Sequence, residues 1–306
     1  MHKRFDDYII NIISISLVLA SLILILYNLT ALKIYSPDGY NIDIYSQLPS
    51  TFWTYCTIVY FIGCILILQK DLGLKVVGCV HLIINYLIIF LVPHQLGYYS
   101  YGADDELSHI GVLKNIILTG YFDITDIYPA THAIYVSLSL LCNLKPNVIS
   151  LLLPSFFSIL FVIGIYIFSR LLLIHWSFVS ILVYPISLIY FFGHFHFSNV
   201  PNYAYFTWLP IFLFCVLKYL NQKNYQISII LTIFIIVLPF THPFVLFFTI
   251  FLLFSLYIAH FLLRSTNIVS VKTLLGLLIC SSFIWFIYSY YLYYFFAAIP
   301  RCLHRG

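Results

Sequence analysis

Long apolar runs alternate with short polar segments along most of this chain. A helix that crosses the roughly 30 Å hydrocarbon core of a bilayer needs about 20 predominantly apolar residues, and the chain contains one such run after another. Because helices satisfy their own backbone groups in lipid, the pattern predicts an all-α polytopic membrane protein with about nine spans. Their approximate ranges are 8–32, 51–68, 76–92, 148–169, 173–192, 204–217, 226–240, 243–263 and 273–298.

The polar segments divide the chain into three predicted regions. N-terminal transmembrane helices occupy 1–92, an acidic loop with interfacial helices occupies 93–146, and a transmembrane helical core occupies 147–306. Within the loop, apolar residues recur at helical spacing over 104–119, and Gly120 ends this pattern. The apolar piece 131–144 is too short to cross a membrane comfortably. We therefore expect two helices that lie along the bilayer surface.

The placement of lysine and arginine predicts the orientation, because these residues favour cytoplasmic loops. If 131–144 lies along the interface, most basic residues fall on the side of the N-terminus. This multi-pass chain is then expected to have a cytoplasmic N-terminus and an external acidic loop in a cell membrane. The turns at 194–202 and 241–243 share that external face. The basic residues assigned to the cytoplasm are Lys3, Arg4, Lys70, Lys75, Arg170, Lys218, Lys223, Arg264 and Lys272.

Composition agrees with a membrane protein and excludes several other classes. Hydrophobic residues make up 63% of the 306 positions and charged residues 8%, against roughly a quarter charged in soluble domains. The net charge of +4 includes no basic block dense enough for nucleic acid. Seven cysteines form no CxxC pair, so neither a disulfide framework nor a zinc site is indicated. No Walker loop or dinucleotide glycine motif is present, and no nucleotide cofactor is expected.

The segment 101–132, YGADDELSHIGVLKNIILTGYFDITDIYPATH, holds five of the ten acidic residues. Asp104 and Asp105 are candidate general bases, since a base must be an ionised group near an acceptor hydroxyl. Asp105 and His109 are four residues apart and are expected to be neighbours on the polar face of the helix over 104–119. Asp105, Glu106 and His109 are candidate ligands of a divalent cation such as Mg²⁺ or Mn²⁺, which prefers carboxylate oxygens. In the alternative interpretation, Asp104 caps a helix while Asp105 and Glu106 occupy its first turn, where the helix dipole is positive.

Several histidines and a tyrosine are expected on the same face as the acidic loop. These candidate substrate-binding residues are Tyr128, His132, His194, His196 and His242. Each histidine can bind a phosphate as a cation or through a hydrogen bond. Each can also cap a helix end or anchor a span at the interface, which is the simpler explanation for any one of them alone.

Taken together, the motifs GADDELSH, TGYF and YPATH, the span FFSILFVIGIYIFSR and the turn THP at 241–243 resemble the GT-C superfamily of membrane glycosyltransferases. The likeness covers about 93–243 and is greatest to prokaryotic members related to the oligosaccharyltransferase and protein mannosyltransferase lineages. Full members usually have more spans, and the chain stops just beyond its last predicted span, so the resemblance indicates a shortened member.

The resemblance implies transfer of a sugar from a polyprenyl-phosphate-linked donor to an acceptor at the external face, as in protein glycosylation or cell-envelope synthesis. The first-loop acid of the family would correspond to Asp104 or Asp105, acting as base or metal ligand. His242, His194 and His196 would stabilise the departing phosphate. The expected partners are the lipid-linked donor and membrane lipids.

Two other classes of function remain open. The chain can be a transporter or lipid-handling protein whose acidic loop is a gate, although such proteins place ionisable residues inside spans and often contain inverted repeats. Here the acids lie at the interface and no internal repeat is evident. The chain can also be a non-catalytic subunit of a membrane complex, which would give it a membrane-protein partner.

Overall fold

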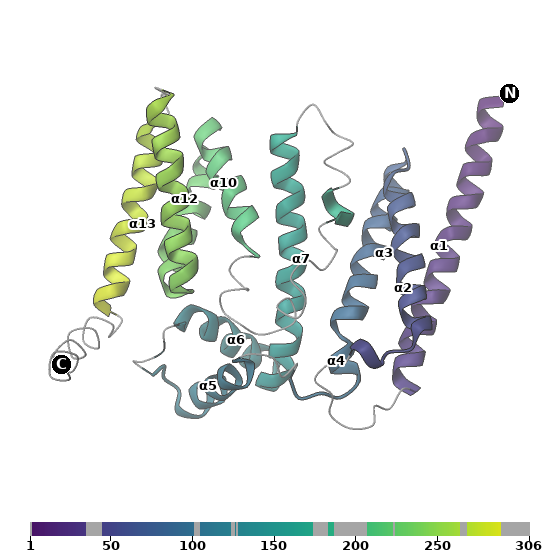
Figure 1. Cartoon of the computed structure of the whole chain (residues 1–306), viewed down its shortest axis with the longest axis horizontal. Helices are drawn as coiled ribbons and strands as arrows, with labels where there is room; N and C mark the ends of the chain where they lie inside the picture. Colours follow the sequence, from purple (N-terminus) through teal and green to yellow (C-terminus); the bar gives the residue numbers. More distant parts are fainter. Residues whose placement is uncertain are drawn as a thin grey trace. The chain divides into compact units, whose positions relative to one another are not determined.

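The computed structural model is helical throughout the residues that it describes (Figure 1). It describes residues 2–34, 45–100, 105–123, 126, 128–173, 183–186, 207–222, 224–263 and 268–288. No strand occurs in these ranges. The predicted all-α class is therefore confirmed. Most of the predicted span 173–192 lies outside the described residues.

Many of the helices begin and end within a few residues of the predicted boundaries, but the first begins at His2 rather than about 8, the one predicted at 204–217 ends at Gln222, and the last begins at Ile268 rather than about 273. The main helices are α1 His2–Ile34, α2 Ser50–Ile67, α3 Leu72–Phe90, α5 Glu106–Thr119, α6 Pro129–Cys142, α7 Pro146–Leu172, α10 Leu209–Gln222, α11 Tyr225–Val237, α12 Pro243–Leu262 and α13 Ile268–Tyr288. Short helical turns are η1 Tyr45–Gln47, α4 Val92–Gln95 and η3 Leu238–Phe240.

Six of the described helices are long and apolar enough to cross a membrane. They lie at Ile12–Ala31, Ser50–Ile67, Leu72–Phe90, Pro146–Leu172, Pro243–Leu262 and Ser270–Ile287. Shorter apolar helices occupy Pro129–Cys142, Leu209–Gln222 and Tyr225–Phe240. Many large apolar side chains on these helices are exposed, as on α12, where Phe244, Phe247 and Phe251 follow one another at helical spacing. Such a surface suits lipid better than water.

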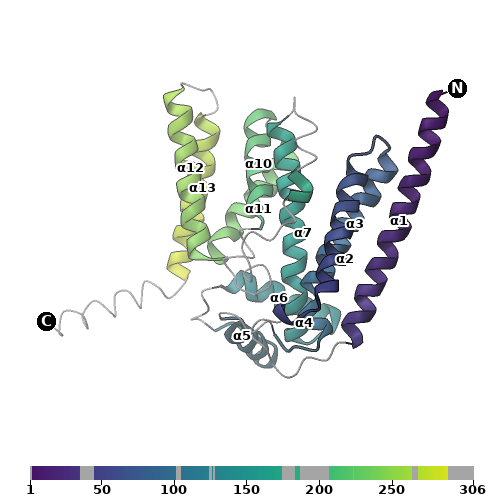
Figure 2. The ribbon, with the colours of Figure 1, turned by 45° about the vertical axis from the view of Figure 1, so that its right-hand side comes forward.

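The chain forms two compact units. The first contains 1–106 and 150–198, and the second contains 107–149 and 199–306. In the first unit, α1, α2 and α3 run side by side in both views (Figures 1 and 2). In the second, α10 to α13 group together, and the hairpin of α5 and α6 lies at the end where α12 begins (Figures 1 and 2).

Helices α2 and α3 of the first unit approach each other closely at two glycines. A Cβ atom at Gly78 would lie 2.8 Å from the backbone nitrogen of Ile67 and 2.9 Å from the carbonyl oxygen of Gly63. Small residues allow this approach, which is how helices associate in a membrane when lipid supplies no hydrophobic driving force. Asp71, in the turn between the helices, caps the start of α3. Its carboxylate accepts a hydrogen bond of 2.9 Å from the Leu74 backbone N–H.

In the second unit, local signals set the ends of the α5–α6 hairpin. Helix α5 ends at Thr119, and Gly120 follows with φ +79°, a left-handed conformation that favours glycine. Pro129 opens α6, because its missing N–H costs nothing in a first turn. Asn143 closes α6 with φ 52°. The two helices predicted at 104–119 and 131–144 are thus confirmed as helices, at Glu106–Thr119 and Pro129–Cys142.

The close approach of α2 and α3 predicts that Gly78→Ala destabilises the protein. The added methyl group meets backbone atoms that cannot turn aside, and overpacking of this kind costs about 1–3 kcal/mol. Thermal unfolding in detergent should show a lower Tm than wild type.

Gly276→Ala is the matched control, because Gly276 lies in the membrane-length helix α13 and nothing lies within 4 Å of an added Cβ there. It should be neutral or slightly stabilising through helix propensity. An equal or higher Tm for Gly78→Ala would contradict tight α2–α3 packing.

Candidate functional site

Four aromatic rings meet in the second unit, where the α5–α6 hairpin lies at the beginning of α12. We call this the ring cluster: His109 on α5, Tyr128 just before α6, His132 on α6, and His242 just before α12. Tyr128 is its centre, because its ring centroid lies 5.6 Å from that of His109, 6.4 Å from that of His132 and 5.0 Å from that of His242. The tyrosine and His242 rings are stacked, with 5° between their planes.

The chain between the two helices places Asp126 against this cluster. One carboxylate oxygen, Oδ1, accepts a hydrogen bond of 2.9 Å from the Tyr128 backbone N–H. The other oxygen, Oδ2, lies 2.7 Å from Nδ1 of His132, one turn into α6. The aspartate therefore folds back over the proline-initiated start of the helix, a local hydrogen bond typical of aspartate before a turn.

Asp126, His132 and His109 form one buried hydrogen-bonded chain. The His132 Nε2 atom lies 3.0 Å from Nδ1 of His109. The side chains of Asp126 and His132 are each 3% exposed, and His109 is 8% exposed. A buried carboxylate is costly unless it is paired and hydrogen-bonded, and this one has both partners.

The carboxylate determines which ring nitrogens carry protons. An ionised aspartate only accepts hydrogen bonds, so His132 donates through Nδ1. With His132 neutral, its Nε2 accepts, and His109 donates through its own Nδ1. The lone pair of His109 is then on Nε2. A proton taken up at that atom can be matched by transfer of the Nδ1 proton to His132, whose positive charge Asp126 would stabilise.

His242 has a defined hydrogen-bonding role as well. Its Nδ1 accepts from the Phe244 N–H at 3.1 Å, capping the first turn of α12. A neutral imidazole that accepts at Nδ1 carries its proton on Nε2. Burial lowers the pKa of His242 below its ordinary value. At neutral pH this ring is therefore a hydrogen-bond donor and not a cation.

The structure brings together four of the predicted residues: His109, Tyr128, His132 and His242. Asp104, His194 and His196 lie outside the described residues. Asp105 is exposed one residue before α5, and Glu106, the first residue of α5, is 0% exposed. Glu106 thus lies in the first turn of α5, as the alternative interpretation expected, whereas Asp105 precedes that turn.

No metal site is formed by the side chains that the structure describes. Among them, no three His, Cys, Asp or Glu residues are grouped so that they could hold an ion. His109, which the sequence placed beside Asp105 on the polar face of α5, is buried and hydrogen-bonded to His132 instead. The divalent cation stays a prediction.

Sequence reasoning gave Asp126 no role. Its signal was present, since the order Asp-Ile-Tyr-Pro puts an aspartate just before a proline-initiated helix, where its side chain can bond the backbone two residues on. The second partner, His132, follows one helical turn inside that helix.

No protein-family model, curated protein or solved structure matches this chain. The resemblance to membrane glycosyltransferases therefore stays an expectation.

The lowered pKa of His242 predicts a pH-dependent contribution to stability. The unfolded chain binds a proton near the ordinary histidine pKa of about 6.5, whereas the folded protein binds it only at lower pH. The stabilisation that neutral His242 gives the folded protein is complete above about pH 6.5. It is lost as the pH falls from there toward the lower pKa of His242 in the folded protein. His242→Asn keeps an acceptor at the cap but cannot titrate.

The Tm of wild type minus that of His242→Asn should thus shrink as the pH is lowered below about 6.5. His94→Asn, at an exposed histidine of α4, is the control for general effects of replacing a histidine. A Tm difference that does not change with pH would contradict the assignment.

Proposed function

We propose that this chain is a membrane glycosyltransferase that moves a sugar from a polyprenyl-phosphate-linked donor to an acceptor at the external membrane face. The observation that carries the proposal is the buried Asp126–His132–His109 chain, with distances of 2.7 and 3.0 Å. Such a chain supplies a base, which sugar transfer needs. The choice of a polyprenyl-phosphate-linked sugar as the substrate comes from the motifs that resemble GT-C enzymes.

In the proposed reaction, the acceptor oxygen forms a bond to the sugar carbon C1 while the bond from C1 to the phosphate oxygen breaks. The acceptor's proton goes to Nε2 of His109, and the Nδ1 proton of that ring passes to His132. Asp126 stabilises the resulting imidazolium, in the way that the carboxylate of a catalytic triad supports its histidine. The bonding electron pair leaves with the lipid phosphate.

His242 would bind that departing phosphate. Its Nε2–H is a donor of defined direction, because Nδ1 is already used by the Phe244 amide. A preorganised donor near developing negative charge stabilises a transition state without reorganisation. The stacked ring of Tyr128 holds His242 beside the two other histidines.

The remaining predicted residues keep proposed roles around this centre. Asp104 and Asp105 are alternative bases or ligands of Mg²⁺ or Mn²⁺, and His194 and His196 are further phosphate donors. We also propose about nine spans, a cytoplasmic N-terminus and an external α5–α6 hairpin, because this topology places most basic residues in the cytoplasm.

A transfer assay in membranes with a labelled polyprenyl-phosphate sugar tests the proposal. Asp126→Asn keeps the shape of the side chain, but its amide group donates to Nδ1 of His132 and so reverses the direction of hydrogen bonding along the chain. His109 then carries its proton on Nε2 and cannot accept another. We expect transfer to fall about 100-fold or more, the scale of general base catalysis.

Asp123→Asn is the matched control, since it removes the same charge from an exposed position three residues away. It should leave transfer near wild type. Undiminished transfer by Asp126→Asn would overturn the proposed base. Removal of metal with a chelator, followed by addition of Mg²⁺ or Mn²⁺, tests the proposed cation in the same assay.

A second candidate is a transporter, favoured by buried polar groups inside the spans of the first unit. His81 on α3 is buried, its Nδ1 donates to the Val77 carbonyl at 2.8 Å, and its Nε2 atom finds no hydrogen-bond partner among the described residues. Asn28 on α1 and Asn85 on α3 are buried nearby around Cys56 of α2. Ionisable groups at membrane depth often mark ion or proton pathways.

Proton flux in liposomes under an imposed pH gradient separates the two candidates. A transferase should show no flux above that of empty liposomes, and His81→Phe should leave sugar transfer within a few fold of wild type. Flux that depends on His81 in the absence of any transfer activity would favour the transporter.

A further inference from the structure

A groove separates the C-terminal halves of α5 and α6 from the start of α7. It has a volume of about 400 Å³ and is lined chiefly by Lys114, Leu118, Ser139, Leu140, Asn143 and Leu144. All of these residues belong to the second unit. None of the residues of the ring cluster lines it, so the groove is a separate feature of the hairpin.

The turn that closes α6 gives the groove a fixed wall. Asn143 is left-handed with φ 52°, and the Leu144 N–H donates to the carbonyl of Ser139 at 3.0 Å. The Ser139 hydroxyl in turn donates to the Leu144 carbonyl at 2.5 Å. These bonds resemble the motif that commonly ends helices, so the wall is part of the helix end itself.

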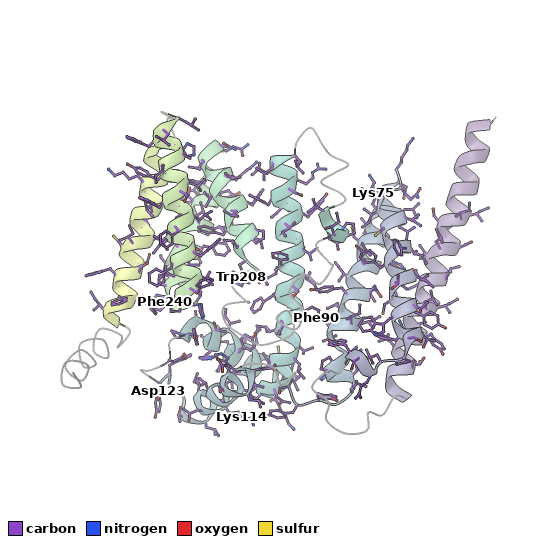
Figure 3. All side chains as sticks on the ribbon, in the orientation of Figure 1. Lys75, Phe90, Lys114, Asp123, Trp208 and Phe240 are labelled. Atoms are coloured by element: carbon purple, nitrogen blue, oxygen red, sulfur yellow. The ribbon has the colours of Figure 1, made fainter. Side chains whose placement is uncertain are left out.

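The chemistry of the groove is that of an amphiphile with negative charge. Leu118 and Leu140, which line the groove, are 84% and 63% exposed, an apolar surface that is costly in water. Lys114 is the one charged side chain among the lining residues, and it lies on α5 at the lower edge of Figure 3. The next lysine, Lys145, is exposed beside Leu144. Among the described residues that line the groove there is no carboxylate.

We propose that this groove holds an anionic phospholipid of the surrounding bilayer. Lys114 contacts the phosphate, the Asn143 amide donates to the headgroup, and the first methylene groups of the acyl chains lie along Leu118, Leu140 and Leu144. A free phosphate would leave the leucines in water. A volume of about 400 Å³ fits a headgroup and the first part of two chains. The bound lipid would fix the hairpin at the membrane surface.

The experiment uses the full chain in phosphatidylcholine nanodiscs containing a small fraction of photoactivatable phosphatidylglycerol or, in parallel, photoactivatable phosphatidylcholine. Cross-linked peptides are mapped by mass spectrometry. We expect phosphatidylglycerol to label residues 114–118 and 139–146 several-fold more than phosphatidylcholine does. Lys114→Gln should reduce that preference about fivefold, and Lys114→Arg should keep it.

Lys75→Gln is the matched control, because Lys75 lies near the start of α3 in the first unit and does not line the groove. It should leave labelling of the groove unchanged. Equal labelling by both lipids, or an equal loss in Lys75→Gln, would overturn the proposal. Displacement of phosphatidylglycerol from these peptides by equimolar polyprenyl phosphate would overturn it in favour of a carrier lipid.

This test is independent of sugar transfer. Loss of the lipid preference in Lys114→Gln supports the lipid site whether or not the protein transfers a sugar. Inactivity of Asp126→Asn bears only on the ring cluster.

Discussion

A buried carboxylate organises the ring cluster of the second unit. Leaving an ionised aspartate unpaired in an apolar environment costs several kcal/mol or shifts its protonation, so Asp126 must be satisfied on both oxygens. The Tyr128 amide satisfies one and the His132 ring satisfies the other. The same two contacts orient the start of α6. They also direct Nε2 of His132 toward α5, where His109 completes the chain.

This arrangement ties local and distant parts of the chain together. Asp126, Tyr128 and His132 lie within seven residues, and a turn followed by a proline-initiated helix brings them together without any help from the rest of the fold. His109 and His242 come from other elements and contact this local structure through their rings. The hydrogen-bond directions of His132 and His109 follow from the Asp126 carboxylate, and that of His242 follows from its role as the cap of α12. Fixed donor and acceptor directions of this kind suit proton transfer.

The α5–α6 hairpin combines two different surfaces. One end contributes the buried histidine chain, and the groove formed by the ends of its helices carries exposed leucines and a lysine. Short amphipathic helices with apolar residues on the outside tend to lie at a membrane surface. The lipid proposed for the groove would hold the hairpin in place and so help to preserve the geometry of the ring cluster.

The sequence by itself predicted where most of the helices lie and some of their ends, because those depend on local features. Apolar runs of membrane length predicted the six long apolar helices, and Gly120 predicted the end of α5, whereas α6 begins at Pro129, two residues before the predicted start. It also indicated that charge and histidine gather in segment 101–132. It placed His109 on the polar face of α5, however, whereas that side chain is buried against α6.

Only the tertiary structure decided which of these groups meet. The pairing of His109 with His132 and the stacking of Tyr128 on His242 depend on how α5, α6 and α12 pack. Leucines, isoleucines and phenylalanines are numerous in these helices, and their pattern shows which face is apolar but not which neighbour it meets. Asp126 meets His132 through local structure, but packing against α5 adds His109 to the pair and so completes the hydrogen-bonded chain.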